Sequence, residues 1–211
     1  MDLTKPMLYH AQQSPSQTAL IYENRTYSYE ELNKEINRYS HGFIREGIQK
    51  GNKVSLFLKN SDLFVICAYA IWKAGGIVVP INYRLTAKEL SYLLDQSDSV
   101  AVVTDAENNE IVLQAIEQIS PRPVVYSLGE TMQGTQPLEQ LRTEFEEEPT
   151  VLLFPTDDAQ ILYTSGTTGL PKGALFTHAN IISLNMSVSV MTKLSQEDKY
   201  LLVAPAFHSA G

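Results

Sequence analysis

The first strong hydrophobic pattern along the chain is that of an amphipathic helix. Apolar residues recur at helical spacing and would share one face: Leu32, Ile36, Tyr39 and Phe43. Ser28 and Glu31 precede them as an S-x-x-E capping box, in which each residue can satisfy a backbone N–H of the other. Gly47 is typical of the residue that ends a helix. The pattern predicts a helix between Ser28 and Gly47.

Short apolar runs then alternate with further helical segments. The runs show little polar alternation, as expected of strands that are buried on both faces; they are 54–58, 77–81, 101–104 and 123–127. The segments between them have helical character, and Thr86 with Glu89 forms a second capping box; they are 62–74, 86–96 and 111–119. This alternation predicts an α/β fold with a doubly wound, mainly parallel sheet. Two shorter runs, 19–22 and 25–28, flank Glu23-Asn24 and indicate a hairpin.

The pattern weakens after residue 128, which suggests three parts: an α/β subdomain (1–128), a connector (129–157), and a segment (158–211) with strands at 161–164 and 173–178. We expect one exposed helix in the connector, from about Leu138 to Glu146. The acidic run 144–148 is most simply interpreted as a solvated face.

Composition excludes several classes of protein. Of the 211 residues, 16 are Lys or Arg and 24 are Asp or Glu, giving a net charge of −8. This balance argues against a general nucleic-acid binder and against docking on anionic lipid. The one cysteine, Cys67, lies in an apolar segment and permits no intrachain disulfide or cysteine zinc site. With no visible signal peptide or transmembrane run, we expect a cytoplasmic protein.

The candidate chemistry lies in the segment 163–173, YTSGTTGLPKG. Its glycines let backbone N–H groups converge on an anion, its hydroxyls can donate to phosphate oxygens, and its lysine adds one mobile positive charge. The order of residues fits neither the Walker A pattern nor the dinucleotide pattern G-x-G-x-x-G. A glycine-rich hairpin turn is the structural alternative for such a loop.

This segment resembles the phosphate-loop signature of the adenylate-forming enzymes, which include acyl-CoA synthetases, luciferases and peptide-synthetase adenylation domains. Three more segments resemble motifs of that family in order and spacing: YSYEEL at 27–32, WKAGGIVVPIN at 72–82 and PAFHSAG at 205–211. The last is similar to the CoA-ligase branch. The resemblance covers nearly the whole chain and implies the N-terminal portion of the large domain of such an enzyme.

The resemblance implies a two-step ligase that uses ATP, Mg²⁺ and coenzyme A. A carboxylate attacks the α-phosphate of ATP, and a thiol then displaces AMP from the acyl-adenylate. By resemblance, the residues that hold the phosphates are Thr164, Ser165, Gly166, Thr167, Thr168, Gly169 and Lys172. Thr164 is also expected to ligate Mg²⁺, and His208 is expected to lie beside the acyl-adenylate; His208 and Lys172 are the candidate catalytic residues. His178, His10 and His41 have no such role, and His178 is expected near a helix start.

The family pattern also indicates the branch and the extent of the chain. Residues 205–211 contain no acid that could pair with a substrate ammonium, which favours a fatty or aryl acid over an amino acid. The family's later motifs and its mobile C-terminal domain, with a catalytic lysine, do not occur, so we expect an inactive N-terminal fragment of a ligase. Two alternatives stay open: an adenylation domain that loads a carrier-protein thiol, and a non-catalytic binding or assembly fragment. Exposed strand edges would favour self-association.

Overall fold

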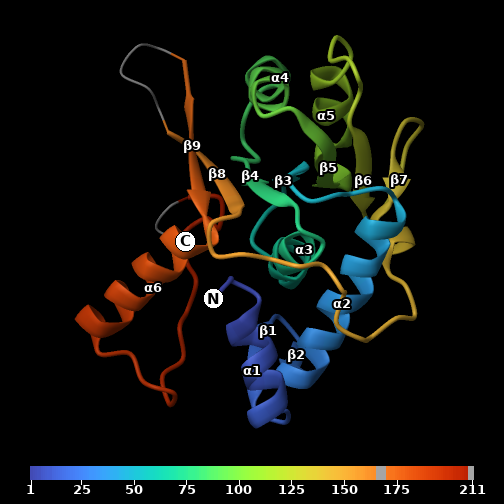
Figure 1. Ribbon diagram of the computed structural model, residues 1–211. Coiled ribbons are helices and arrows are strands. Elements are labelled where there is room, and N and C mark those ends of the chain that lie inside the picture. Colours follow the sequence, from blue (N-terminus) through green and yellow to red (C-terminus); the bar gives the residue numbers. More distant parts are fainter. Residues whose placement is uncertain (165–169, 209–211) are drawn as a thin grey trace.

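The computed structural model describes residues 1–164 and 170–208. Within them, seven strands form one sheet in the order β7-β6-β5-β3-β4-β8-β9 (Figure 1). All neighbours pair in parallel except β8 and β9, which are antiparallel. The predicted doubly wound, mainly parallel sheet is confirmed. The strands are β3 (Lys53–Phe57), β4 (Ile77–Pro80), β5 (Ser99–Asp105), β6 (Val124–Leu128), β7 (Gln136–Pro137), β8 (Asp158–Thr164) and β9 (Lys172–Thr177).

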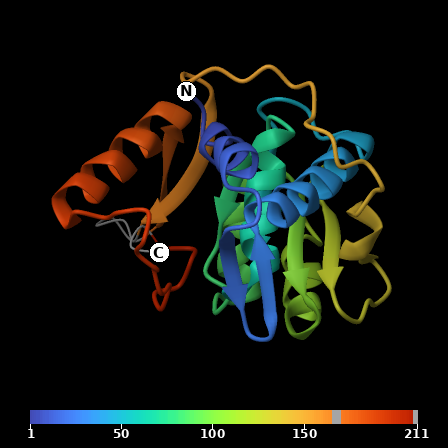
Figure 2. The same ribbon diagram turned by 90° about the horizontal axis from the view of Figure 1, so that it is seen from below.

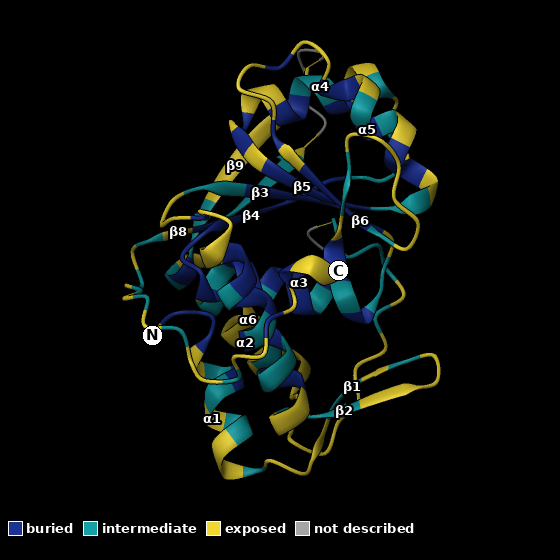
Figure 3. Cartoon of the chain, turned by 90° about the vertical axis from the view of Figure 1, so that its right-hand side faces the viewer, coloured by how far each residue is buried: buried dark blue, intermediate teal, exposed yellow. Residues whose placement is uncertain are grey.

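Helices cover both faces of the sheet. Figure 1 shows α4 (Ala87–Gln96) and α5 (Asn109–Ala115) on one face, and α1 (Lys5–Gln13), α2 (Tyr29–Arg45) and α3 (Asp62–Lys73) on the other. Along β5, Ala101 and Val103 pack in the core on the α2–α3 side, whereas Val102 packs in the core on the α4–α5 side. Figure 3 shows the central strands as mainly buried between these layers. Two buried faces explain why the strands lack polar alternation.

Both predicted capping boxes are present. Ser28 caps α2 and Thr86 caps α4, and in each case the glutamate three residues later bonds back to the cap's own N–H. The helix α2 ends at Arg45, and Gly47 follows at φ +90°, a conformation that glycine adopts without steric cost. The predicted hairpin forms as β1 (Thr18–Tyr22) and β2 (Arg25–Ser28).

One predicted helix has different ends in the structure, and one helix was not predicted. The helix predicted over 111–119 is α5, which begins at Asn109 and ends at Ala115, although Ile116 and Ile119 stay buried beyond it. The helix α1 was not predicted, because its mixed composition gives only a weak amphipathic pattern. It packs against α2, and its His10 stacks on Tyr29 with ring centroids 4.9 Å apart.

The prediction of an exposed helix from Leu138 to Glu146 is wrong. The segment forms a short 3-10 helix, η2 (Leu138–Leu141), whose Leu138 and Leu141 are buried. The backbone then becomes extended, because Thr143 bonds to the carbonyl of Arg38 in α2 through both its N–H and its hydroxyl. Contacts with α2 therefore replace the hydrogen bonds that would continue a helix. Gly42 permits this approach, since a Cβ there would lie 1.7 Å from the carbonyl oxygen of Leu141.

The interpretation of 144–148 as a solvated face is also wrong in part. Residues 142–157 form a strap that crosses α2 and α3 before the chain enters β8 (Figure 1). Glu148 accepts hydrogen bonds at 2.7 Å from the ammonium of Lys73, which is only 3% exposed, and Glu146 pairs with Arg38 in α2. The physical reason is that a buried lysine needs a partner, and the strap supplies it.

Candidate functional site

The ends of the candidate phosphate loop are held by two antiparallel strands. The strand β8 ends at Thr164 and β9 begins at Lys172, and these two residues are opposite each other in the ladder. The Thr164 hydroxyl donates to the Lys172 carbonyl oxygen at 3.5 Å. Both residues are exposed. The structure therefore brings these two predicted ligands together, while the other five lie outside the described residues: Ser165, Gly166, Thr167, Thr168 and Gly169.

The sheet places this hairpin at the edge where ligands of α/β folds commonly bind. Val78 of β4 pairs in parallel with Gln160 of β8, so the segments after β3, β4 and β8 leave the sheet at the same, carboxyl edge. Figure 2 shows the C-terminal segment beside the edge toward which the strands point. Loops that follow parallel strands form the ligand sites of open α/β sheets.

The segment that carries His208 is fixed at this edge by residues from two other strand ends. The side chain of Asn60, after β3, donates from Nδ2 to the carbonyl of Ala204 at 2.8 Å and accepts at Oδ1 from the N–H of Ala206 at 2.7 Å. Phe207 packs edge-on against Tyr83, after β4, with centroids 5.7 Å apart. His208 is exposed at the end of this segment.

Asn60 is a site residue that sequence reasoning missed. Its side-chain amide bonds to the backbone of residues 204–206 through one donor and one acceptor, as the backbone of a neighbouring strand would. The only sequence signal is a polar residue shortly after a buried strand, at the edge where parallel strands end. Many loop residues satisfy that description, so contact with a segment more than a hundred residues away could not be predicted.

The other histidines have structural contacts, and His178 lies at a helix start as expected. His178 begins the helix α6 (His178–Thr192) and is 1% exposed, and its Nδ1 accepts a hydrogen bond from the N–H of Leu3 at 3.2 Å. Burial lowers the pKa of His178 below its ordinary value of 6.5, so the neutral ring is favoured. His41 bonds to the carbonyl of Glu147 at 2.9 Å. Cys67 is fully buried in α3, where burial raises its pKa to about 12.

Thr164 offers a neutral oxygen, which suits a hard cation such as Mg²⁺ when phosphate oxygens complete the shell. Among the described residues no group of three or more His, Cys, Asp or Glu side chains could hold a metal ion.

Within the part of the chain that the structure describes, no helix has the length and apolarity needed to cross a membrane.

A mainly parallel sheet with a glycine- and threonine-rich loop at its carboxyl edge is an arrangement used by nucleotide-binding α/β proteins. The family model described as AMP-binding enzyme matches residues 8–211. Because this match covers more than half of the chain, the chain belongs to the AMP-binding enzyme family, and the resemblance of its motifs is confirmed.

Several known proteins that are similar to the chain carry the name of a CoA ligase. A crotonobetaine/carnitine–CoA ligase from Salmonella arizonae is 38% identical over 203 residues, which cover 90% of this chain and 39% of that protein. The inhibitor-bound N-terminal domain of FACL13 from Mycobacterium tuberculosis is 31% identical with a TM-score of 0.86, covering 98% of this chain and 52% of that one. The chain therefore spans about half, or less, of the length of these relatives.

A second similar structure contains a bound reaction intermediate. The o-succinylbenzoate CoA synthetase from Bacillus subtilis, in complex with its acyl-adenylate, is 26% identical with a TM-score of 0.80. The match covers 99% of this chain and 50% of that one. The first of these proteins is thus related to the chain in sequence, and the other two share its fold.

Proposed function

We propose that the chain is part of an ATP-dependent carboxylate–CoA ligase. In the first step a carboxylate oxygen bonds to the α-phosphorus of ATP and pyrophosphate leaves. In the second step the thiol sulfur of coenzyme A bonds to the acyl carbon, and AMP leaves. The observation that carries this proposal is the Thr164–Lys172 pair at the stem of the phosphate loop, in a chain with relatives named as a CoA ligase and a CoA synthetase.

The roles proposed for the loop residues follow from charge and position. The ammonium of Lys172 would neutralise phosphate charge, and the hydroxyl of Thr164 would donate to a phosphate oxygen or ligate Mg²⁺. Mg²⁺, when bound, would neutralise charge on the phosphates. Displacement at phosphorus depends mainly on such neutralisation and on alignment of the reactants, so this chain needs no protein nucleophile for the first step.

We propose His208 as the residue beside the carboxylate and the α-phosphate. Its exposure at the carboxyl edge, on a segment fixed by Asn60 and Tyr83, supports this role. An imidazole there can donate a hydrogen bond to an oxygen of either group. The neighbouring residues 205–211 contain no acid, which supports a carboxylic acid without an α-ammonium group, such as a fatty or aryl acid.

The test is a thioester assay on the full-length protein with MgATP, coenzyme A and carboxylic acids that range from short to long chains, with aryl acids and α-amino acids included. We expect AMP, pyrophosphate and acyl-CoA in equal amounts, with α-amino acids giving no product. Lys172→Met should lower the rate by at least ~10²-fold. Formation of ADP and phosphate instead, or no acid-dependent product with any member of the panel, would overturn the proposal.

A further inference from the structure

The stem of the phosphate loop is bonded to the helix α4 from both strands. On the β8 side, the hydroxyl of Tyr163 donates to the carbonyl of Leu93, at 3.3 Å, and to Oε1 of Gln96. On the β9 side, the carbonyl of Pro171 accepts a hydrogen bond from the hydroxyl of Tyr92 at 3.3 Å. The two contacts converge on residues 92–96, the last turn of α4.

The last turn of α4, which accepts or makes these contacts, is held in place by buried side chains. Leu90, Leu93 and Leu94 are at most 3% exposed, and the capping box fixes the other end of the helix. The carbonyl of Leu93 also accepts the N–H of Ser97 at 3.0 Å, so its two lone pairs are both used. Burial raises the pKa of Tyr163 to about 12, which keeps its phenol protonated as a donor at neutral pH.

Gly173 explains how the Tyr163 ring reaches α4. The two residues are opposite each other in the β8–β9 ladder. A Cβ on Gly173 would lie 2.9 Å from Cγ2 of Ile161 and 3.3 Å from Cε1 and Cζ of Tyr163. The contact with Ile161 is closer than real Cβ atoms come, and the contacts with the ring are unusually tight, so a side chain at 173 would push Ile161 aside and shift the ring by a few tenths of an ångström. The glycine of this motif position is therefore required for space rather than for an unusual backbone conformation.

The anchored pair is next to the pair that carries the candidate ligands. Tyr163–Gly173 and Thr164–Lys172 are consecutive pairs of the ladder. Movement of the Tyr163 ring would therefore be transmitted directly to the Thr164 hydroxyl and to the backbone of Lys172. We propose that Tyr163 and Tyr92 are positioning residues that hold the stem of the loop on α4 and so set the affinity for the phosphates of ATP. This inference rests on the proposed function of the loop.

The test compares single hydroxyl deletions in the full-length protein. Each variant keeps the ring: Tyr163→Phe removes the bonds of its hydroxyl to Leu93 and Gln96, and Tyr92→Phe removes the single bond to Pro171. We expect each to raise KM for ATP by roughly 3- to 10-fold, with KM for the carboxylic acid and for coenzyme A unchanged. Gly173→Ala keeps both hydroxyls but displaces the Tyr163 ring, and it should produce the same selective rise.

Tyr39→Phe is the matched control. It also removes a buried phenol hydroxyl, one that bonds to Glu139 at 3.1 Å on the opposite face of the sheet. We expect KM for ATP to stay at the wild-type value in this variant. Unchanged KM for ATP in Tyr163→Phe and Tyr92→Phe, or an equal rise for all three substrates, would overturn the positioning role alone. A wild-type protein without ATP-dependent activity would instead overturn the proposed function, and the inference with it.

Discussion

At the scale of single residues, the buried Lys73 has the most demanding environment. Its ammonium bonds to both carboxylate oxygens of Glu148 and to the side-chain carbonyls of Asn33 and Asn37, all at 2.7 or 2.8 Å. Desolvation still lowers the pKa of Lys73 below its ordinary value of 10.5. Removing one member of such a cluster leaves a charge in the interior with too few partners.

We therefore expect Glu148→Ala to destabilise the chain by about 2 kcal/mol, less than for a fully buried pair because Glu148 is partly exposed. Urea unfolding at concentrations where the chain is monomeric would measure it. Glu147→Ala is the control, since that neighbouring residue is exposed and contributes only its backbone carbonyl to a contact. Equal free energies of unfolding for the two variants would show that the cluster contributes nothing.

The same carboxylate gives a pH dependence. Burial alone would raise the pKa of Glu148, but the bonds from Lys73, Asn33 and Asn37 more than offset it and hold the pKa below the ordinary 4.5. The stabilisation from Glu148 is thus fully present above pH 4.5 and is lost as the pH falls through the lower, folded value. Below pH 4.5 the free energy of unfolding should fall more steeply for wild type than for Glu148→Gln; parallel curves would contradict this.

Asn60 supports a prediction about activity. Asn60→Ala removes both bonds that hold residues 204–206, so His208 would lose its fixed position. In the full-length protein we expect the rate of acyl-adenylate formation to fall by roughly 10-fold or more. Asn24→Ala, in the turn of the distant β1–β2 hairpin, should leave the rate unchanged. A wild-type rate for Asn60→Ala would remove this residue from the site.

At the scale of elements, the close packing of η2 on α2 predicts that a side chain at position 42 lowers the stability of the chain. Gly42→Ala should destabilise the chain by at least ~2 kcal/mol, because the clash with the Leu141 carbonyl exceeds the ~1 kcal/mol that alanine gains in a helix. The measurement is again urea unfolding.

Ser40→Ala, on the same helix, is the control. The Ser40 hydroxyl is buried and has no hydrogen-bond partner among the described residues, so removing it should leave the free energy of unfolding equal or higher. A Gly42→Ala variant as stable as Ser40→Ala would contradict the close approach of η2.

The elements also indicate how far sequence reasoning reaches. Patterns within one element predicted most of the fold: the capping residues Ser28 and Thr86, and the runs that became β3 to β6. The failures lie where contacts distant in sequence decide the conformation. The chain after Leu141 bonds to α2 instead of continuing as a helix, and Glu148 turns inward because Lys73, 75 residues earlier, is buried. The candidate loop came from its motif, whereas Asn60, Tyr92 and the space-giving role of Gly173 needed the structure.

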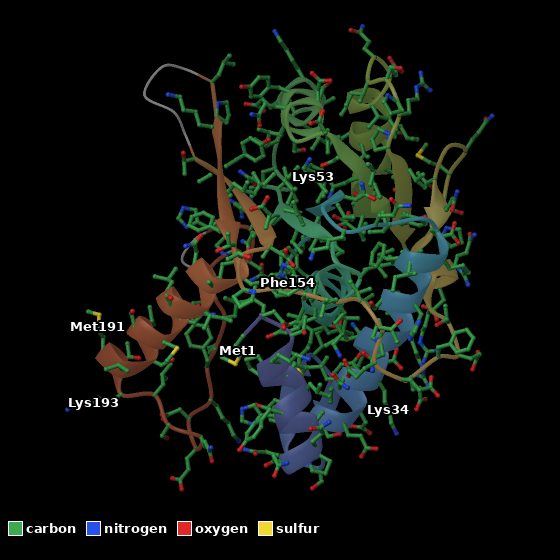
Figure 4. The ribbon with its side chains drawn as sticks, in the orientation of Figure 1. Met1, Lys34, Lys53, Phe154, Met191 and Lys193 are labelled. Carbon is green, nitrogen blue, oxygen red and sulfur yellow. The ribbon has the colours of Figure 1, made fainter. Side chains whose placement is uncertain are left out.

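At the scale of the whole molecule, the side formed by α6 and β9 exposes many apolar residues. The helix α6 buries only His178, and five of its large apolar residues are exposed: Leu184, Met186, Val188, Val190 and Met191. Figure 4 shows Met191 at the outer end of α6, pointing away from the sheet. The strand β9 ends the sheet order and is mostly exposed. Such a patch beside an edge strand is a surface for association.

We therefore predict that the 211-residue chain self-associates. Light scattering over a range of concentrations should show a mass that rises above 23.6 kDa. Replacing Val190 and Met191 by Lys should reduce the rise, since they are 78% and 83% exposed. The control replaces Leu152, which is exposed in the strap and does not belong to α6, by Lys. A constant monomer mass for the wild-type chain at high concentration would contradict the prediction.

The exchange of labelled pyrophosphate into ATP tests the central proposal most directly, because it requires reversible attack on the α-phosphate. We predict acid-dependent exchange by the full-length protein, strongly reduced in Lys172→Met, and no exchange by the 211-residue chain alone. Exchange that does not depend on a carboxylic acid, its complete absence from the full-length protein with every acid tested, or wild-type exchange by Lys172→Met would contradict the assignment of the loop to adenylate formation.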